Sequence, residues 1–283
     1  MRRLGICSLC LEYGPLTFEH IPPKRVFNNV PAVAHNLYGL EVGSIYKKKP
    51  RLLKKAAGLG RHALCERCNG YTASLYGEEF ADWTTQCLRY ADRIGDSSEM
   101  LLPFQIRPLN VLKQIATMIM AVSESTQSAP SFDRLRGFAL SPNSMQFPME
   151  ISLASYMNPV DVARVIVPQL TQNRLSGSCA VLDTRIGSSV FVIGEVAFPP
   201  MGYVAYITAN DRRLSDDFGT LRDLRGFSSW HYNQRANIFL SMPVRRPFGP
   251  VPGYYPDLKR SPLVRYIDDN HLVLTAKNAR PSI

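Results

Sequence analysis

Apolar residues at helical spacing mark two segments of this chain. In the first, four large side chains recur at intervals of four, three and four residues, which predicts a helix that begins near Cys68 and turns one face into the core. In the second, Pro108 suits the first turn of a helix, and apolar residues follow at intervals of three or four. We interpret the first set as core rather than as a surface for stacking bases. The two sets are Tyr76, Phe80, Trp83 and Cys87, and Leu112, Ile115, Ile119 and Val122.

Short strand-like segments surround these helices. Residues 16–18 and 61–64 are β-prone and predict the two strands of a hairpin, with residues 24–60 as a long loop between them. Pro22 and Pro23 end the first strand, because proline has no N–H to donate to a ladder. In the second half of the chain, short β-branched runs alternate with Gly and Pro. They predict a mainly antiparallel sheet packed on one or two helices.

Helix-breaking residues near position 95 predict two domains. Gly95 and the serines close to it interrupt the first helix and mark a boundary. We therefore predict an α+β fold with a small N-terminal domain over residues 1–95 and a larger α+β domain, with its mainly antiparallel sheet, over residues 96–283. Residues 149–155 alternate between apolar and polar side chains, as expected of a strand with one buried face.

The charge balance points to a polyanionic partner. The formal net charge is +10 with a pI near 9.4, which favours nucleic acid. Residues 1–90 hold thirteen Lys and Arg against seven Asp and Glu. The basic run from 47 to 55 is either a solvated loop or an arm that contacts phosphates, and both interpretations stay open. The residues that we assign to nucleic-acid contacts are Lys24, Arg25, Lys47, Lys48, Lys49, Arg51, Lys54, Lys55 and Arg61.

Hydropathy predicts a soluble cytoplasmic protein with no membrane partner. No apolar run reaches the roughly 18 residues that a bilayer requires. The longest candidate, from Val111 to Val122, is interrupted by Lys113 and Gln114. The first five residues lead into no apolar signal segment, so we expect the thiols to stay reduced.

Two cysteine pairs with C-x-x-C spacing predict a structural zinc site. Each C-x-x-C turn offers two sulfur atoms, and Zn²⁺ prefers four soft ligands in a tetrahedron. The alternative of two disulfides requires an oxidising compartment. The four predicted ligands are Cys7, Cys10, Cys65 and Cys68.

The residues between and after these cysteines add candidate chemistry. Residues 17–24 read Thr-Phe-Glu-His-Ile-Pro-Pro-Lys, and Asn69 follows the last cysteine directly. Two C-x-x-C pairs that enclose an acid–His pair and end in Asn resemble the zinc-bearing form of the HNH endonuclease family. The Glu-His-Ile-Pro-Pro-Lys core is similar to a bacterial subgroup. The resemblance covers roughly the first third of the chain and implies a treble-clef, or ββα-metal, finger.

The resemblance also implies roles for individual residues. His20 would be the general base, since an imidazole accepts a proton near neutral pH. Glu19 and Asn69 would bind a catalytic divalent ion, Mg²⁺ or Mn²⁺. Taken alone, Asn69 is also a candidate helix N-cap and His20 a structural histidine. Because neighbouring residues of a strand point to opposite faces, Glu19 and His20 would act together only where the strand ends.

One position departs from the family pattern. The family usually carries Asn or another polar residue on the second strand, where it orients the catalytic histidine, but this chain has Gly60 there. His62 is one candidate for that role. Arg61 has a planar guanidinium suited to a phosphate. The other candidates for the orienting role are the loop residues Asn28, Asn29 and Asn36.

The resemblance therefore predicts a metal-dependent nuclease that hydrolyses phosphodiester bonds. Double-stranded DNA is the favoured substrate, and nicking is included because one finger cuts one strand at a time. Many such bacterial nucleases serve restriction or anti-phage defence, and the second domain would recognise substrate or a protein partner. Two alternatives remain: a non-catalytic zinc-stabilised module that binds nucleic acid, and a finger that only docks proteins.

Overall fold

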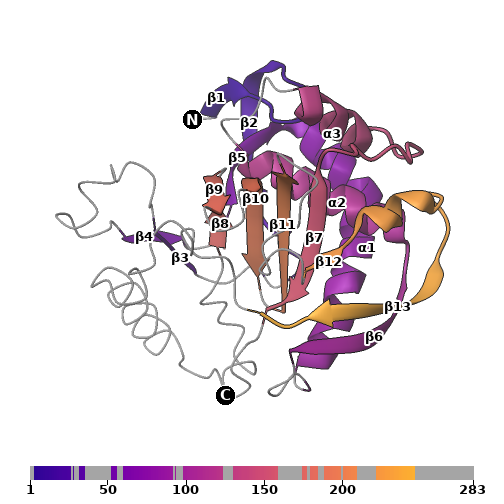
Figure 1. Cartoon of the computed structure of the whole chain (residues 1–283). Coiled ribbons are helices and arrows are strands. Elements are labelled where there is room, and N and C mark those ends of the chain that lie inside the picture. The colour runs from indigo at the N-terminus through magenta and orange to yellow at the C-terminus, as the bar shows by residue number, and fades with distance from the viewer. Residues whose placement is uncertain are drawn as a thin grey trace, which may run out of the picture.

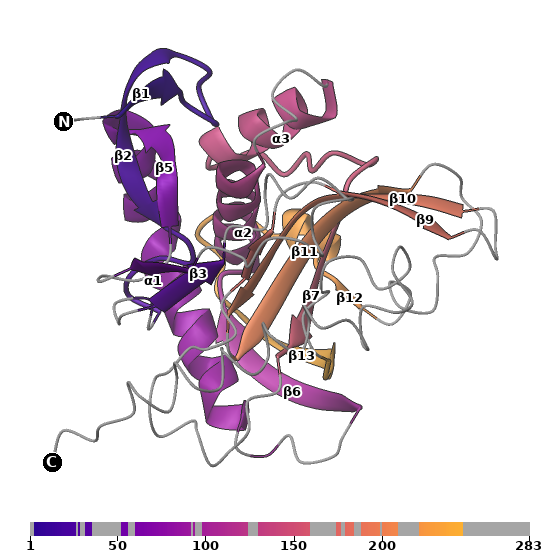
Figure 2. The same cartoon turned by 90° about the vertical axis from the view of Figure 1, so that its left-hand side faces the viewer.

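The protein is described by a computed structural model that places three layers next to one another. In Figure 2, a small N-terminal sheet lies on one side of a helical layer and a larger sheet on the other. Helices and antiparallel sheets together confirm the α+β class. The described residues are 3–26, 28, 32–35, 52–55, 60–91, 93, 98–123, 130–158, 174–176, 179–183, 188–198, 200–208 and 221–245.

The N-terminal sheet contains the predicted hairpin. Its order is β1 (Arg3–Ile6), β2 (Tyr13–His20) and β5 (Gly60–Cys65), all antiparallel. In the segment predicted as a loop, β3 (Ala32–His35) pairs with β4 (Leu52–Lys55) as a short ribbon. Local structure therefore exists in this insertion.

Three helices form the middle layer. They are α1 (Glu66–Ala91), α2 (Pro108–Val122) and α3 (Pro130–Leu140). The first two were predicted, and all eight side chains of their predicted apolar faces are buried. The third was not predicted. Every residue of α2 is buried, because α1, α3 and the large sheet surround it. None of the described helices combines the length and apolar character of a membrane span.

The larger sheet confirms the predicted antiparallel arrangement. Its strand order is β12-β7-β11-β10-β8, and β9 also pairs with β10. The expectation that residues 149–155 form a strand with one buried face was wrong, since five of the six residues of β7 are buried and both its faces are covered. The strands are β7 (Ser152–Met157), β8 (Arg174–Ser176), β9 (Cys179–Asp183), β10 (Ser188–Phe198), β11 (Met201–Thr208) and β12 (Arg222–Asp223).

A two-stranded ribbon closes the far end of α1. It pairs β6 (Glu99–Ile106) with β13 (Ala236–Pro243) along their whole length, and a 3₁₀ turn η2 (Arg225–Ser229) precedes β13. In Figure 1 the ribbon runs beside the lower end of α1. Side-chain and backbone groups of Gln86 and Gln105 exchange two hydrogen bonds of 2.9 Å across this junction.

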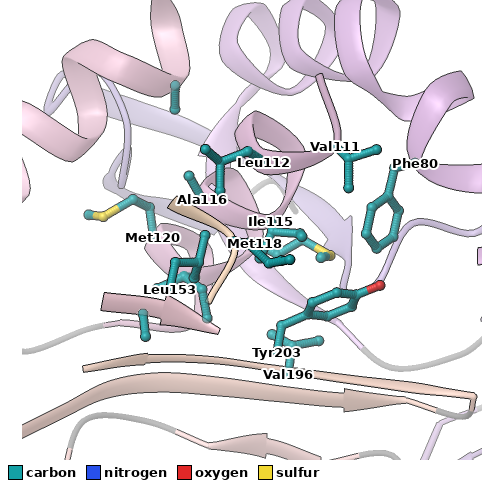
Figure 3. Close-up of a cluster of buried hydrophobic side chains, with 14 of the residues drawn as sticks. Phe80, Val111, Leu112, Ile115, Ala116, Met118, Met120, Leu153, Val196 and Tyr203 are labelled. Atoms are coloured by element: carbon teal, nitrogen blue, oxygen red, sulfur yellow. The ribbon is translucent and has the colours of Figure 1, made fainter. Parts of the chain in front are cut away.

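The core is continuous from the N-terminal sheet to the large sheet. Figure 3 shows Phe80 of α1 and Ile115 of α2 facing Tyr203 of β11. Trp83 of α1 donates its indole N–H to the Tyr203 hydroxyl at 2.8 Å, so that a buried hydrogen bond joins the helical layer to the sheet. One hydrophobic cluster extends from Cys7 to Met242. The domain boundary between residues 95 and 96 stays a prediction.

Candidate metal centre and histidine face

Four cysteines converge where β1, β5 and α1 meet. Cys7 and Cys10 lie in the turn after β1, Cys65 ends β5, and Cys68 lies in the first turn of α1. Their sulfur atoms all lie within 4.8 Å of one another, and those of Cys10 and Cys65 are 3.8 Å apart. A tetrahedral site with Zn–S bonds of about 2.3 Å would separate its sulfur atoms by about 3.8 Å. The donor set therefore fits a structural zinc ion, as predicted.

The surroundings of the thiols shift their pKa values in different directions. Burial acts to raise the pKa of Cys7, but backbone N–H groups, among them that of Cys65 at 3.3 Å, overcome this effect and lower it. Burial raises the pKa of Cys68, and the neighbouring Cys7 thiolate adds to the increase. Because metal ligation requires thiolates, binding would release protons.

A buried arginine fixes the first cysteine turn to the helical layer. Arg136 of α3 is 3% exposed and donates its Nε to the carbonyl oxygen of Ser8 at 3.0 Å. The Ser8 N–H in turn donates to the carbonyl of Ala63 in β5 at 2.9 Å. Sequence reasoning missed this support, because Arg136 belongs to the helix that was not predicted.

One face of the β2–β5 hairpin carries two histidines around one aromatic ring. The ring centroid of Phe18 lies 5.1 Å from that of His20 and 5.5 Å from that of His62, both in edge-to-face geometry. His20 pairs with Gly60 in the ladder, and Phe18 with His62, so that the imidazoles are diagonal neighbours. The period-two alternation Phe18-x-His20 is the signal that would have identified Phe18.

Gly60 is required by the backbone at this point. A Cβ atom on Gly60 would lie 2.0 Å from the carbonyl oxygen of Glu19, which excludes every other residue without a shift of the strand. The position where the resemblance calls for a polar side chain therefore has no room for one. His62, two residues further along β5, presents its side chain on the same face.

Glu19 lies on the opposite face of β2, as the alternation predicts. Its side chain is 8% exposed, and burial raises its pKa to about 7. Arg61 is its partner across the ladder, but the Arg61 Nη1 donates to the carbonyl of Val122 at the end of α2, at 3.2 Å. Among the residues that the structure describes, the Glu19 carboxylate makes no hydrogen bond or ion pair.

Asn69 is held on the side of the hairpin that Glu19 faces. Its Nδ2 donates to the Thr17 hydroxyl at 3.0 Å, and that hydroxyl donates to the carbonyl of Leu64 at 2.9 Å. Thr17 and Glu19 share a face of β2, about 7 Å apart along the strand. The N-cap alternative for Asn69 was wrong, because α1 begins at Glu66.

The basic candidates are only partly within the described structure. Lys24 and Arg25 are exposed just after the proline turn, and Asn28 donates its Nδ2 to the Pro22 carbonyl at 2.6 Å. The backbones of Lys54 and Lys55 belong to β4. The other predicted contacts and loop asparagines lie outside the described residues: Lys47, Lys48, Lys49, Arg51, Asn29 and Asn36.

An open cleft of about 600 Å³ adjoins the histidine face. It lies between β2, β5 and the start of α1, and sequence reasoning gave no sign of it because its walls come from two segments far apart in the sequence, residues 12–18 and 62–67. Its walls include Glu12, Thr17, Phe18, His62, Glu66 and Arg67.

Comparison of the chain with protein-family models, with curated proteins and with solved structures found no match. The functional interpretation therefore depends on the geometry of this site and on the motif that the sequence carries. Both centre on the end of β2, where His20 and Glu19 occupy opposite faces of the strand.

Proposed function

We propose that this protein is a metal-dependent endonuclease of the HNH type, built on a treble-clef finger. It would hydrolyse phosphodiester bonds in nucleic acid, and DNA is the favoured substrate. It would cut one or both strands, in restriction or anti-phage defence. The observation that carries the proposal is the buried carboxylate of Glu19, which has no partner among the described residues and lies next to His20. An isolated buried charge is costly, and a divalent cation would offset that cost.

Glu19 and Asn69 are the residues that would hold this ion. Carboxylate and amide oxygens are the hard ligands that Mg²⁺ and Mn²⁺ prefer. The hydrogen bond from the Asn69 Nδ2 to Thr17 fixes the amide and leaves Oδ1 as its ligand atom. When bound, such an ion supplies Lewis acidity at the phosphate and stabilises the departing oxygen.

His20 would accept the proton of the attacking water. It is the last residue of β2 and is partly exposed, so that solvent and substrate can approach its imidazole. Phe18 packs against both imidazoles, and we assign to His62, acting through this ring, the positioning role of the family's asparagine. Glu19 and His20 are neighbours at the end of β2 but point to opposite faces, so the ion and the base would reach one phosphate only around the end of the strand.

The charge distribution supports nucleic acid as the substrate. Lys24 and Arg25 are exposed within five residues of His20 and would contact phosphates on either side of the cut. The net charge of +10 attracts a polyanion along its length. The domain over residues 96–283 would recognise the substrate or a protein partner.

Supercoiled plasmid provides the test. The zinc-loaded protein is incubated with Mg²⁺, with Mn²⁺ and with EDTA, and relaxed and linear products are separated on a gel. We expect metal-dependent cleavage that His20→Ala reduces at least about a hundredfold, since general-base catalysis contributes on that order. His231→Ala is the matched control, because His231 is exposed and lies in the turn after η2.

The outcome separates the proposal from its alternative. Glu19→Gln should remove cleavage while DNA binding persists, because it removes a ligand charge and keeps the side-chain volume. If DNA shifts on a gel but stays intact with every metal, the protein is instead a zinc-stabilised binding module.

A further inference from the structure

The cleft beside the histidine face differs in chemistry from a phosphate site. With Zn²⁺ bound, the four thiolates would leave a net charge of about −2 beside the cleft, since Cys65 belongs to its wall. Glu12 and Glu66 add carboxylates, and Arg67, the arginine among the described residues of the wall, forms an ion pair of 3.0 Å with Glu12. The surroundings therefore repel a phosphate and suit an uncharged group that offers N–H donors.

The walls of the cleft suit a flat ring. Phe18 and His62 provide aromatic surface, and the volume of about 600 Å³ falls within the roughly 300–1,000 Å³ of small-ligand pockets. Bases stack on aromatic side chains regardless of their identity. A carboxylate such as that of Glu66 accepts a hydrogen bond from the amino group of cytosine or adenine, which thymine lacks.

We propose that this cleft holds one unpaired nucleobase of the strand that is cut, with a preference for a base that carries an exocyclic amino group. The proposal rests on the proposed nuclease function and names its substrate class. Phe18 and His62 belong both to the cleft and to the histidine face, so that the base and the phosphate at His20 would belong to neighbouring positions of one strand. A base inside a duplex cannot reach such a cleft without leaving its stack.

Binding to defined oligonucleotides tests this without requiring cleavage. Wild-type protein, zinc-loaded and without added Mg²⁺ or Mn²⁺, is titrated by fluorescence anisotropy into duplexes that carry one unpaired cytosine, one unpaired thymine, one unpaired abasic nucleotide, or none. We expect the unpaired cytosine to bind about fivefold or more tighter than the abasic site, which is the low end of base–aromatic stacking. Equal affinity for cytosine and abasic duplexes would overturn the proposal.

Glu66→Gln isolates the amino-group preference. An amide can donate to the thymine oxygen as well as accept from cytosine, so we expect the variant to bind the unpaired thymine more tightly than the wild type does and to lose the preference for cytosine over thymine. Glu78→Gln is the matched control, because Glu78 is exposed on α1 and lies outside the cleft. An unchanged preference in Glu66→Gln would contradict the assignment of Glu66.

Cleavage assays then distinguish the two proposals. If no metal supports cleavage but the base preference is present, the nuclease assignment fails and the cleft assignment stands. If plasmid is cleaved and the rate is the same for paired, unpaired and abasic positions, the nuclease assignment stands and the base cleft is wrong.

Discussion

Two regions of this protein bury an ionisable side chain, Lys113 in one and Glu19 in the other, and within the described residues only Lys113 has hydrogen-bond partners. At the junction of α2 and α3, the Lys113 ammonium is fully buried and donates to three backbone carbonyls, those of Phe138, Ser141 and Ser144, at 2.6, 2.8 and 2.9 Å. At the end of β2, Glu19 is almost as buried and makes no such bond within the described residues. The two groups differ in pairing rather than in burial.

The pKa values sharpen this difference. Burial lowers the pKa of Lys113 to about 7 and raises that of Glu19 to about 7. For Lys113, the three carbonyls and the Phe138 ring face, 3.7 Å from Nζ, act against burial and favour the charged form. Nothing in the described structure does the same for Glu19. A satisfied buried charge stabilises a fold, whereas an unsatisfied one suggests a ligand.

The largest expected effect concerns the zinc site, which holds the region around Glu19. Cys65→Ser removes one of four thiolates, and structural zinc in small fingers contributes about 10 kcal/mol of binding free energy at neutral pH. We expect the variant to lose zinc and the N-terminal sheet while the helices and large sheet stay folded, as hydrogen exchange of β5 and β11 would show. Cys87→Ser is the control for a buried thiol outside the zinc site. Full zinc occupancy in Cys65→Ser would contradict the four-ligand centre.

The next largest effect concerns Lys113 and its three hydrogen bonds. Lys113→Met replaces the ammonium with an apolar group of similar length and leaves three carbonyls at the end of α3 without their donor. We expect a loss of about 4 kcal/mol of unfolding free energy, measured by urea denaturation. Glu19→Gln should cost far less or stabilise, because the wild-type carboxylate has no partner to lose. Equal losses of unfolding free energy in the two variants would contradict the conclusion that Lys113 is paired and Glu19 is not.

Neither buried charge could be recognised from the sequence. In the sequence, Lys113 only interrupts an apolar run. Its buried position cannot be inferred there, because the carbonyls that surround it come from the end of α3, a helix that the apolar pattern does not predict. The cysteine pairs, the hairpin and α1 were predictable, since local spacing determines each of them. The pairing of β6 with β13 was not, because Ile106 meets Ala236 and no local pattern encodes so distant a contact. That Phe18, His20 and His62 lie on one face could not be predicted, because it depends on the register in which β2 pairs with β5.

The pH dependence of stability measures the unsatisfied charge directly. Between pH of about 4.5 and 7 the folded state holds a proton on Glu19 that the unfolded state has released, so stability falls as the pH rises through this window. The full difference is about 3 kcal/mol. We expect the wild type to lose this amount relative to Glu19→Gln, with zinc kept saturating so that the thiols contribute equally. Added Mg²⁺ or Mn²⁺ at pH 8 should restore it in the wild type alone. A pH profile that is identical in the two proteins would show that Glu19 has a partner in solution.

The smallest effect concerns the contact that joins α3 to the first cysteine turn. Arg136 reaches from α3 to the Ser8 carbonyl in the first cysteine turn, and its Nη1 also donates to Asp133 at 2.6 Å. Groups behind metal ligands typically change metal affinity by roughly ten- to a hundredfold. Arg136→Met keeps the packing of the side-chain stem and removes the bond to Ser8, so we expect zinc to bind about tenfold more weakly, as measured by competition with a chelator. Arg134→Met is the matched control, since Arg134 lies exposed on the same helix and pairs with Glu150. If both variants bound zinc as the wild type does, the hairpin alone would hold the cysteine turn. The zinc site and the junction of α2 and α3 would then be energetically independent in spite of their shared core.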